Sequence, residues 1–193
     1  MGRLSIVNKP GIVESSWHYE DPTCAEKIRD AYCNLLLTLN PGLARQVVIM
    51  CIGTDRSTGD SLGPLVGTRL LQYGMTETSV LGSLEYPVHA VNLEQTLARV
   101  SESWDQPFIV AVDACLGRTD RIGYVSVKPG VLRPGTALKK ELPPVGELHI
   151  SGVVNVAGFL EHIVLQNTRL GTVFKMADTI ARGIWLAHLS LTE

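Results

Sequence analysis

The sequence predicts an α/β fold with a mostly parallel, partly mixed central sheet. Short apolar runs at residues 47–52 and 107–115 are rich in β-branched side chains, as buried strands are. Segments with helical spacing of apolar residues separate these runs, and alternating strands and helices are typical of parallel sheets. The chain has 193 residues, 45% of them hydrophobic, without an internal repeat or a convincing boundary. A single domain over residues 1–193 is therefore expected.

The N-terminal part begins without a clear period, so residues 1–20 are expected to form an arm that packs on the surface or frays. A helix is then expected to begin near Pro22, because proline suits the first helical position. Thr23 and Glu26 have the spacing of a capping box. The Asn-Pro-Gly sequence at residues 40–42 is a stop signal that ends this helix.

Residues 47–71 form the most informative stretch, because a strand, a polar loop and a helix follow one another there. The loop at residues 53–59 comes directly after the strand, and a helical pattern of apolar residues follows from Leu62. Ligands of open α/β sheets bind at the carboxyl ends of strands, so a binding site is expected at this loop. Its candidate substrate-binding residues are Thr54, Asp55, Arg56 and Ser57.

The remaining elements continue the alternation. Strands are expected at 79–84, 122–127 and 147–155, and helices from residue 92, at 159–165 and at 172–189. The strand at 122–127 is expected to lie antiparallel to its neighbour. Residues 129–146 are rich in proline and glycine and form the longest irregular segment. Long irregular loops of compact domains are often functional, so this segment is expected to border the site.

Asp60 and Asp113 are the candidate catalytic residues. Asp113 ends an otherwise apolar strand, and Asp60 stands where the helix after the 53–59 loop begins. If their strands are neighbours, both carboxylates reach one crevice, where such a pair can share a proton or hold a divalent metal ion. The alternative is purely structural: Asp60 as a helix cap, and Asp113 as the cap of a turn.

Two histidines are further candidates for substrate binding. His89 follows a strand end, and His149 lies in a strand that could flank the crevice. Beside two carboxylates, a histidine can act as a general base or complete a metal site. Taken alone, each is also compatible with a structural, hydrogen-bonded histidine.

Several classes of function are disfavoured. A net charge of −2 gives no basic footprint for nucleic acid, and no apolar run approaches the length of about 20 residues that spans a bilayer. The glycines of the 53–59 loop match neither the GxGxxG motif nor the loop ending in Gly-Lys-Ser/Thr that bind nucleotides. The GxSxG motif of serine hydrolases is also absent from the sequence. The four cysteines have no zinc-binding spacing, which favours a reducing, intracellular compartment.

Two motifs carry a resemblance to a known family. The segment GTDRSTGDSLGPLVG at residues 53–67, together with VDA at residues 112–114, resembles the spore germination protease group. That group is related to the hydrogenase maturation peptidases. Its two catalytic carboxylates lie in DALGP and IDA motifs, which correspond to Asp60 and Asp113 here. The resemblance implies a phosphorylase/hydrolase-like three-layer α/β sandwich and an atypical aspartic-type peptidase of sporulation or germination.

The resemblance also implies partners and a location. The expected partner is a peptide or protein substrate, with the small acid-soluble spore proteins as candidates, in the cytoplasm of the forespore or spore core. No nucleic acid or membrane partner is expected, and a homo-oligomer is left open. Two alternatives also stay open: a catalytically inactive regulator that binds a peptide or partner, and a hydrolase of a small metabolite.

No cofactor and no tightly held metal ion are expected. The related maturation peptidases hold a divalent metal ion with two acidic residues and a histidine, but the chain has no sure match for that histidine. Arg56 is a fixed cation in the same loop and is expected to pair with Asp60 or Asp113, which would lower the pKa of that carboxyl and repel a metal ion.

Overall fold

The computed structural model describes residues 15–76, 79–135 and 142–192. The strands are β1 (Ser15–His18), β2 (Val47–Cys51), β3 (Val80–Leu81), β4 (Phe108–Gly117), β5 (Tyr124–Pro129) and β6 (Leu148–Val156). The α-helices are α1 (Cys24–Leu39), α2 (Leu62–Gln72), α3 (Leu93–Ser103), α4 (Glu161–Gln166) and α5 (Leu170–Thr192). Short 3₁₀ turns are η1 (Pro41–Leu43), η2 (Gly59–Ser61) and η3 (Thr119–Arg121).

Over the described residues the strands form one sheet in the order β1-β5-β6-β4-β2-β3. Strands β3, β2, β4 and β6 run parallel, whereas β5 is antiparallel to β6 and β1 is antiparallel to β5. The predicted α/β fold, with a mostly parallel and partly mixed sheet, is thus confirmed, including the antiparallel placement of the 122–127 segment. Strand β3 is shorter than expected because Gly82 has a φ of 87° and the chain turns there.

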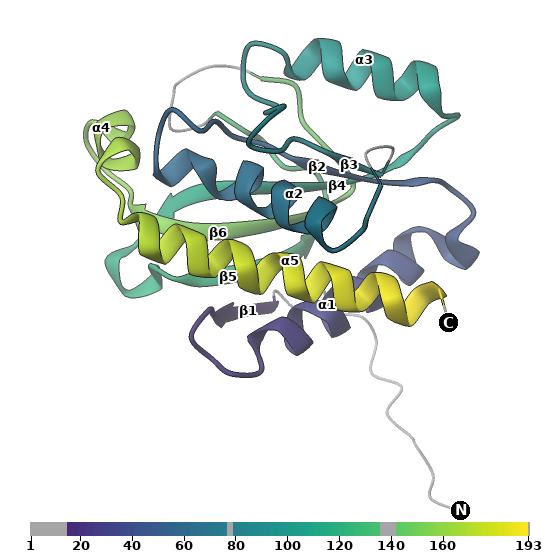
Figure 1. Ribbon diagram of the computed structural model, residues 1–193, viewed down its shortest axis with the longest axis horizontal. Coiled ribbons are helices and arrows are strands. Elements are labelled where there is room, and N and C mark those ends of the chain that lie inside the picture. The colour runs from purple at the N-terminus through teal and green to yellow at the C-terminus, as the bar shows by residue number, and fades with distance from the viewer. Residues whose placement is uncertain (1–14, 77–78, 136–141, 193) are drawn as a thin grey trace, which may run out of the picture.

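Helices cover the sheet on both faces, as a three-layer sandwich requires. Figure 1 shows α3 on one side and α1 and α5 on the opposite side. The larger core lies between the sheet and α1, α2 and α5, and contains Phe108, Val110 and Val112 of β4. A smaller core under α3 contains Ala111 of the same strand. Among the described residues, no helix combines the length and the apolar character needed to cross a membrane.

The N-terminal region differs from the sequence-based expectation in two ways. Residues 15–18, for which the sequence predicts only an arm, form the edge strand β1, in which Trp17 pairs with Val125. The capping box is wrong, because Thr23 makes no side-chain cap to α1. Instead, an oxygen of the Asp21 carboxylate accepts hydrogen bonds from the N–H and the hydroxyl of Thr23, at 2.9 and 2.8 Å. Residues 1–14 lie outside the described part of the chain.

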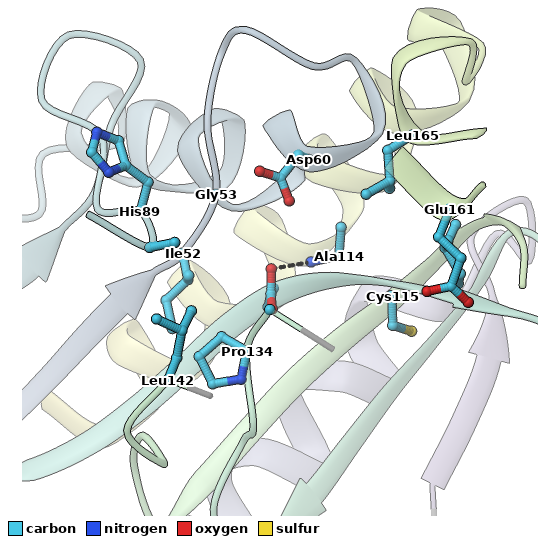
Figure 2. A pocket seen from close by; sticks show the side chains of 14 residues that line it. Ile52, Gly53, Asp60, His89, Ala114, Cys115, Pro134, Leu142, Glu161 and Leu165 are labelled. Carbon is cyan, nitrogen blue, oxygen red and sulfur yellow. Dashed lines mark hydrogen bonds between the residues drawn. The ribbon is translucent and has the colours of Figure 1, made fainter. Parts of the chain in front are cut away.

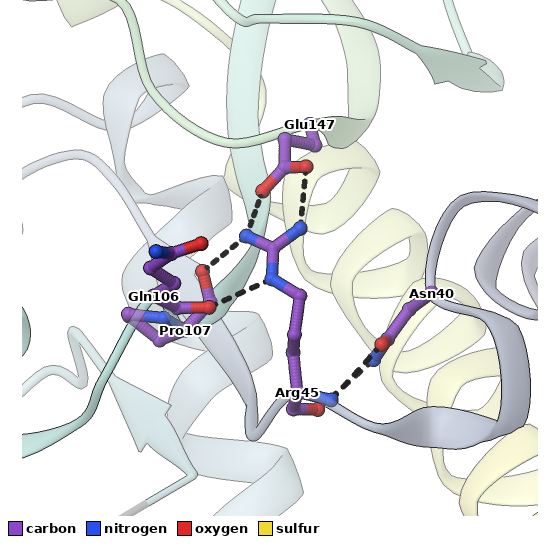
Figure 3. Close-up of polar contacts among 5 residues, drawn as sticks. All are labelled: Asn40, Arg45, Gln106, Pro107 and Glu147. Atoms are coloured by element: carbon purple, nitrogen blue, oxygen red, sulfur yellow. Dashed lines mark hydrogen bonds and ion pairs between the residues drawn. The ribbon is translucent and has the colours of Figure 1, made fainter.

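Arg45 ties three connections together at the edge of the sheet where the parallel strands begin (Figure 3). Its guanidinium donates two hydrogen bonds to the carboxylate of Glu147, at 2.7 and 2.5 Å, and others to the backbone carbonyls of Gln106 and Pro107. The amide of Asn40 bonds the backbone of Arg45 on both sides. The bidentate, charge-assisted contact between Arg45 and Glu147, together with the other hydrogen bonds of Arg45, fixes the connections that lead into β2, β4 and β6. The site described next lies at the other ends of these strands.

Candidate active site

Asp60 and Asp113 line the same cavity, which has a volume of about 230 Å³. Strands β2 and β4 are parallel neighbours in which Cys51 pairs with Val112, so their carboxyl ends meet. Asp113 is the next residue of β4, and Asp60 lies in η2, after the loop that follows β2. The sheet order therefore brings the two candidate carboxylates together, as their positions in the sequence predict.

The cavity is walled by segments that follow four strands. Its lining residues are Ile52, Gly53, Asp60, His89, Ala90, Asp113, Ala114, Cys115, Leu116, Pro134, Gly135, Leu142, Glu161 and Leu165. Figure 2 shows the Asp60 carboxylate near the centre, with His89 on one side and Glu161 on the other. The irregular 129–146 segment borders the cavity through Pro134, Gly135 and Leu142, as expected, while its residues 136–141 lie outside the described part of the chain.

Two glycines place Asp60 by letting backbones approach closely. Gly53 has a φ of 145°, and a Cβ atom there would lie 2.0 Å from the carbonyl oxygen of Asp60. At Gly63, in the first turn of α2, a Cβ atom would lie 2.1 Å from the carbonyl oxygen of Ile52. The N–H of Thr54 donates to the carbonyl of Asp60 at 3.1 Å, which closes the loop at its neck. Only residues without a side chain permit this contact between the start of α2 and the end of β2.

Asp113 is buried, with 8% of its surface exposed. Burial raises the pKa of its carboxyl well above the usual value, and the negative charge of Asp60 raises it further. The N–H of Ala114 donates to Oδ1 of Asp113 at 2.8 Å and offsets only part of this rise in pKa. The protonated, neutral form of Asp113 is therefore favoured well above the pH at which an exposed aspartate ionises.

Asp60 is less deeply enclosed and keeps its negative charge more readily. Burial raises its pKa, while the N–H of Thr54 and the charge of His89 lower it. Because burial and the charge of Asp60 raise the pKa of Asp113 well above its usual value, Asp113 is the carboxyl that holds its proton to higher pH. At a pH between the two pKa values, the arrangement offers one ionised and one protonated carboxyl, the combination needed for a general base and a general acid.

The polar residues of the loop after β2 lie around the cavity rather than in its wall. Asp55 and Arg56 are exposed, and Thr54 and Ser57 are half-buried. The expectation that Arg56 pairs with Asp60 or Asp113 is wrong for the described residues: the side chain of Arg56 makes no ion pair, and the pKa values of both carboxyls are raised. The Ser57 hydroxyl is buried without a hydrogen-bond partner among the described residues.

The two candidate histidines have different positions. His89 lines the cavity, and its Nδ1 accepts a hydrogen bond from the N–H of Val91 at 3.2 Å. His149 lies two residues before Ser151, which pairs with Asp113, and so sits further back along the sheet. Its Nδ1 is 3.0 Å from the carbonyl oxygen of Gly130, and His149 is not among the described residues that line the cavity.

Sequence reasoning missed the wall opposite His89. Glu161 and Leu165 of α4 line that side, and Cys115 lies beyond Asp113 on β4. Helix α4 follows β6, so the rule that segments after parallel strands line the crevice could have identified it. Burial and the nearby Asp113 raise the pKa of the Cys115 thiol to about 11, which keeps it protonated and a poor nucleophile at neutral pH.

The donor set does not fit the metal site that the maturation peptidases suggest. In the described part of the chain, no three His, Cys, Asp or Glu side chains come together so as to hold a metal ion. The two carboxylates would need a third protein ligand for a tight site.

We predict that the purified protein retains no stoichiometric metal ion after dialysis, because two carboxylates without a third ligand bind divalent ions weakly. Elemental analysis of the dialysed protein measures this directly, with the Asp60→Asn variant as the matched control. Near-stoichiometric zinc, nickel or manganese in the wild type, absent from the variant, would contradict the prediction and place a metal ion at the carboxylates.

Comparisons with known proteins bear on both the family and the fold. A family model described as "Protein of unknown function (DUF1256)" matches residues 16–183. The chain is 46% identical over 175 residues to a Bacillus subtilis (strain 168) protein described as "Uncharacterized protein YyaC", covering 91% of this chain and 83% of that one.

One solved structure supports the fold. It is the [NiFe] hydrogenase maturation protease HycI from Thermococcus kodakarensis KOD1, with a TM-score of 0.51 and 20% identity. The match covers 79% of this chain and 97% of that one. The relation to hydrogenase maturation peptidases expected from the motifs is thus confirmed at the level of the fold.

Proposed function

The chain belongs to the DUF1256 family, and we propose that it is a peptidase in which Asp60 and Asp113 activate water. The observation that carries the proposal is that two carboxyls, both with raised pKa values, line one cavity at the carboxyl ends of β2 and β4. The likeness of the fold to that of a maturation protease supports a protein substrate.

In the proposed reaction each carboxyl accepts one proton and donates one proton. Asp60, ionised, takes a proton from water while the water oxygen bonds to the peptide carbonyl carbon. Asp113, protonated, donates its proton to the carbonyl oxygen, giving a neutral tetrahedral diol. As the C–N bond breaks, Asp60 passes its proton to the leaving amine nitrogen, and a diol hydroxyl returns a proton to Asp113. Both carboxyls then stand as they began.

The finer biological role rests on the resemblance of the GTDRSTGDSLGPLVG and VDA motifs to the germination proteases. We place the activity in sporulation or germination, within the forespore or spore core, and take the small acid-soluble spore proteins as the first candidate substrates. A regulator that binds such a protein without cleaving it is the principal alternative, and the assay below separates the two.

The test is a cleavage assay with purified protein, read by mass spectrometry, on small acid-soluble spore proteins. We expect cleavage to fall about 10²–10⁴-fold in Asp60→Asn, because its general base is lost. The rate should decline on the acid side as Asp60 gains a proton, and on the alkaline side as Asp113 loses its own. Because both pKa values are raised, the bell-shaped dependence of the cleavage rate on pH should lie above the pH range in which aspartates usually ionise.

Asp105→Asn is the control, since Asp105 is exposed and does not line the cavity. Cleavage that persists in Asp60→Asn would refute the mechanism. Binding of the spore proteins by the wild type without any cleavage would assign the regulator role instead.

A further inference from the structure

Large apolar side chains are exposed on two opposite sides of the carboxylate cavity. On the α4 side they are Phe159 and Leu160, and on the side of the loop before α3 they are Leu84, Tyr86 and Val91. We call these two groups the apolar rims. Phe159 is 90% exposed, Val91 85% and Tyr86 70%. Such concentrations of exposed apolar surface mark interaction sites.

The segments that carry the rims also build the cavity wall. Glu161 and Leu165 line the cavity from the α4 side, and His89 and Ala90 line it from the other side. In Figure 2 these walls stand on either side of Asp60. The rim residues are therefore close neighbours in sequence of residues that wall the candidate active site.

The backbone of the α4 rim is strained. Leu160 has a φ of 57° and a ψ of 47°, the left-handed conformation, while its side chain is 48% exposed. A leucine in that conformation costs about 1–2 kcal/mol. Because the side chain is half exposed, its burial does little to offset this cost. Strain of this kind gathers at functional sites, which points to a role for the rim beyond folding.

A second, larger cavity opens on the His89 side. Its volume is about 600 Å³, and it shares His89 with the carboxylate cavity. Tyr86, Pro87 and Val88 contribute apolar surface to its lining, while Glu85, Asn92 and Arg99 contribute polar surface, so its wall is mixed. The space is large enough for an apolar side chain of a bound peptide, next to the residues that would cut it.

We propose that the apolar rims bind an extended segment of a protein substrate that carries apolar side chains on both sides of the bond to be cleaved. One side chain enters the cavity beside His89, and another lies on Phe159 and Leu160. An extended chain points successive side chains to opposite faces, so a bound segment can offer apolar side chains on either side of the bond at the carboxylates. The assignment rests on the proposed peptidase function.

The charges near the rims favour a peptide over a membrane surface. Glu85 and Arg99 line the cavity on the Tyr86 side, and Glu161 lines the carboxylate cavity on the other side. Anionic lipid attracts clusters of lysine and arginine, and among the described residues that line the two cavities Arg99 is the one such side chain. A polar cavity between the rims likewise suits a peptide backbone, which brings its own hydrogen-bonding groups.

Peptide binding without cleavage tests the proposal, and it is measured by fluorescence anisotropy in the Asp60→Asn background. The probe is a fluorescein-labelled peptide of about a dozen residues, in which Phe and Leu alternate with Ser. A matched peptide carries Asn in place of Phe and Leu. We expect the apolar peptide to bind at least about tenfold more tightly, and Phe159→Ser or Tyr86→Ser to weaken that binding about tenfold.

The matched control is Leu37→Ser on α1, because Leu37 is also exposed, at 45%, but lies on a helix that leads toward the opposite end of the sheet. Equal binding of both peptides would overturn the proposal, as would equal effects of Phe159→Ser and Leu37→Ser. A dimer that Phe159→Ser dissociates would assign the rims to a second copy of the chain, and this too would overturn it. Apolar binding without cleavage by the wild type would refute the peptidase and leave the docking site standing.

Discussion

The Asp113→Asn variant is expected to lose peptide cleavage and, at pH 7, to unfold at a higher temperature than the wild type. Asparagine has nearly the same shape, and its Oδ1 can keep the hydrogen bond from the N–H of Ala114. It cannot ionise, however, so the cost of holding a carboxyl in a buried place beside Asp60 disappears. Active sites commonly sacrifice stability in this way.

The direction of the pH dependence follows from the raised pKa of Asp113. Folded protein keeps the proton at pH values where the unfolded chain has released it, so stability is full below the usual pKa of aspartate. Stability is then lost as the pH rises toward the raised value. Each unit of raised pKa corresponds to about 1.4 kcal/mol, and each kcal/mol to about 2–4 °C in Tm for a domain of this size.

Thermal unfolding of wild type and Asp113→Asn between pH 4 and pH 8 measures this effect. The gain in Tm should be largest at the highest pH and should shrink toward pH 4. Asp105→Asn, an exchange at an exposed carboxylate, should stay within about 0.5 kcal/mol of the wild type. A variant Asp113→Asn that is less stable than the wild type at pH 7 would show that the charge itself supports the fold.

The Gly63→Ala variant is expected to lose both stability and catalytic activity. Its new Cβ atom would lie 2.1 Å from the carbonyl oxygen of Ile52 and 2.7 Å from the nitrogen of the same residue. Neither backbone atom can turn aside as a flexible side chain could, so α2 must move away from β2. Overpacking of this kind costs about 1–3 kcal/mol.

The loss of activity follows from the same displacement. Asp60 lies in η2, immediately before α2, so a shift of the helix carries its carboxylate away from Asp113. A misplacement of about 1 Å can reduce a catalysed rate by about 10²-fold. Gly171→Ala in α5 is the control: nothing lies within 4 Å of its added Cβ, so stability should be unchanged or slightly higher. Normal activity and stability in Gly63→Ala would contradict the assigned role of this close contact.

The two variants separate two contributions to the site. Asp113 has its raised pKa because the sheet and the walls of the cavity bury it, whereas Asp60 has its position because two glycines allow a tight turn. Loss of activity with a gain in stability is expected only for the first, and loss of both only for the second. Circular dichroism of each variant distinguishes a displaced helix from a loss of folding.

The sequence alone determined the alternation of strands and helices and the positions of the two carboxylates. Strands β2 and β4 are covered by helices on both faces, so they read as short, continuous apolar runs that local composition reveals. Asp113 interrupts such a run at its end, and the carboxyl ends of parallel strands share one edge of the sheet. For that reason a linear pattern could predict that Asp60 and Asp113 meet.

Only the tertiary structure decided the features that depend on partners distant in the chain. Strand β1 has four half-buried residues and no apolar period, and it exists as a strand because β5 offers a free edge to pair with. Arg56 is exposed and makes no ion pair among the described residues, although its place in the sequence allowed one with Asp60 or Asp113. The wall formed by Glu161 and Leu165, and the raised pKa values of the two carboxyls, arise from elements that meet only in the folded chain, and no local sequence pattern records burial of that kind.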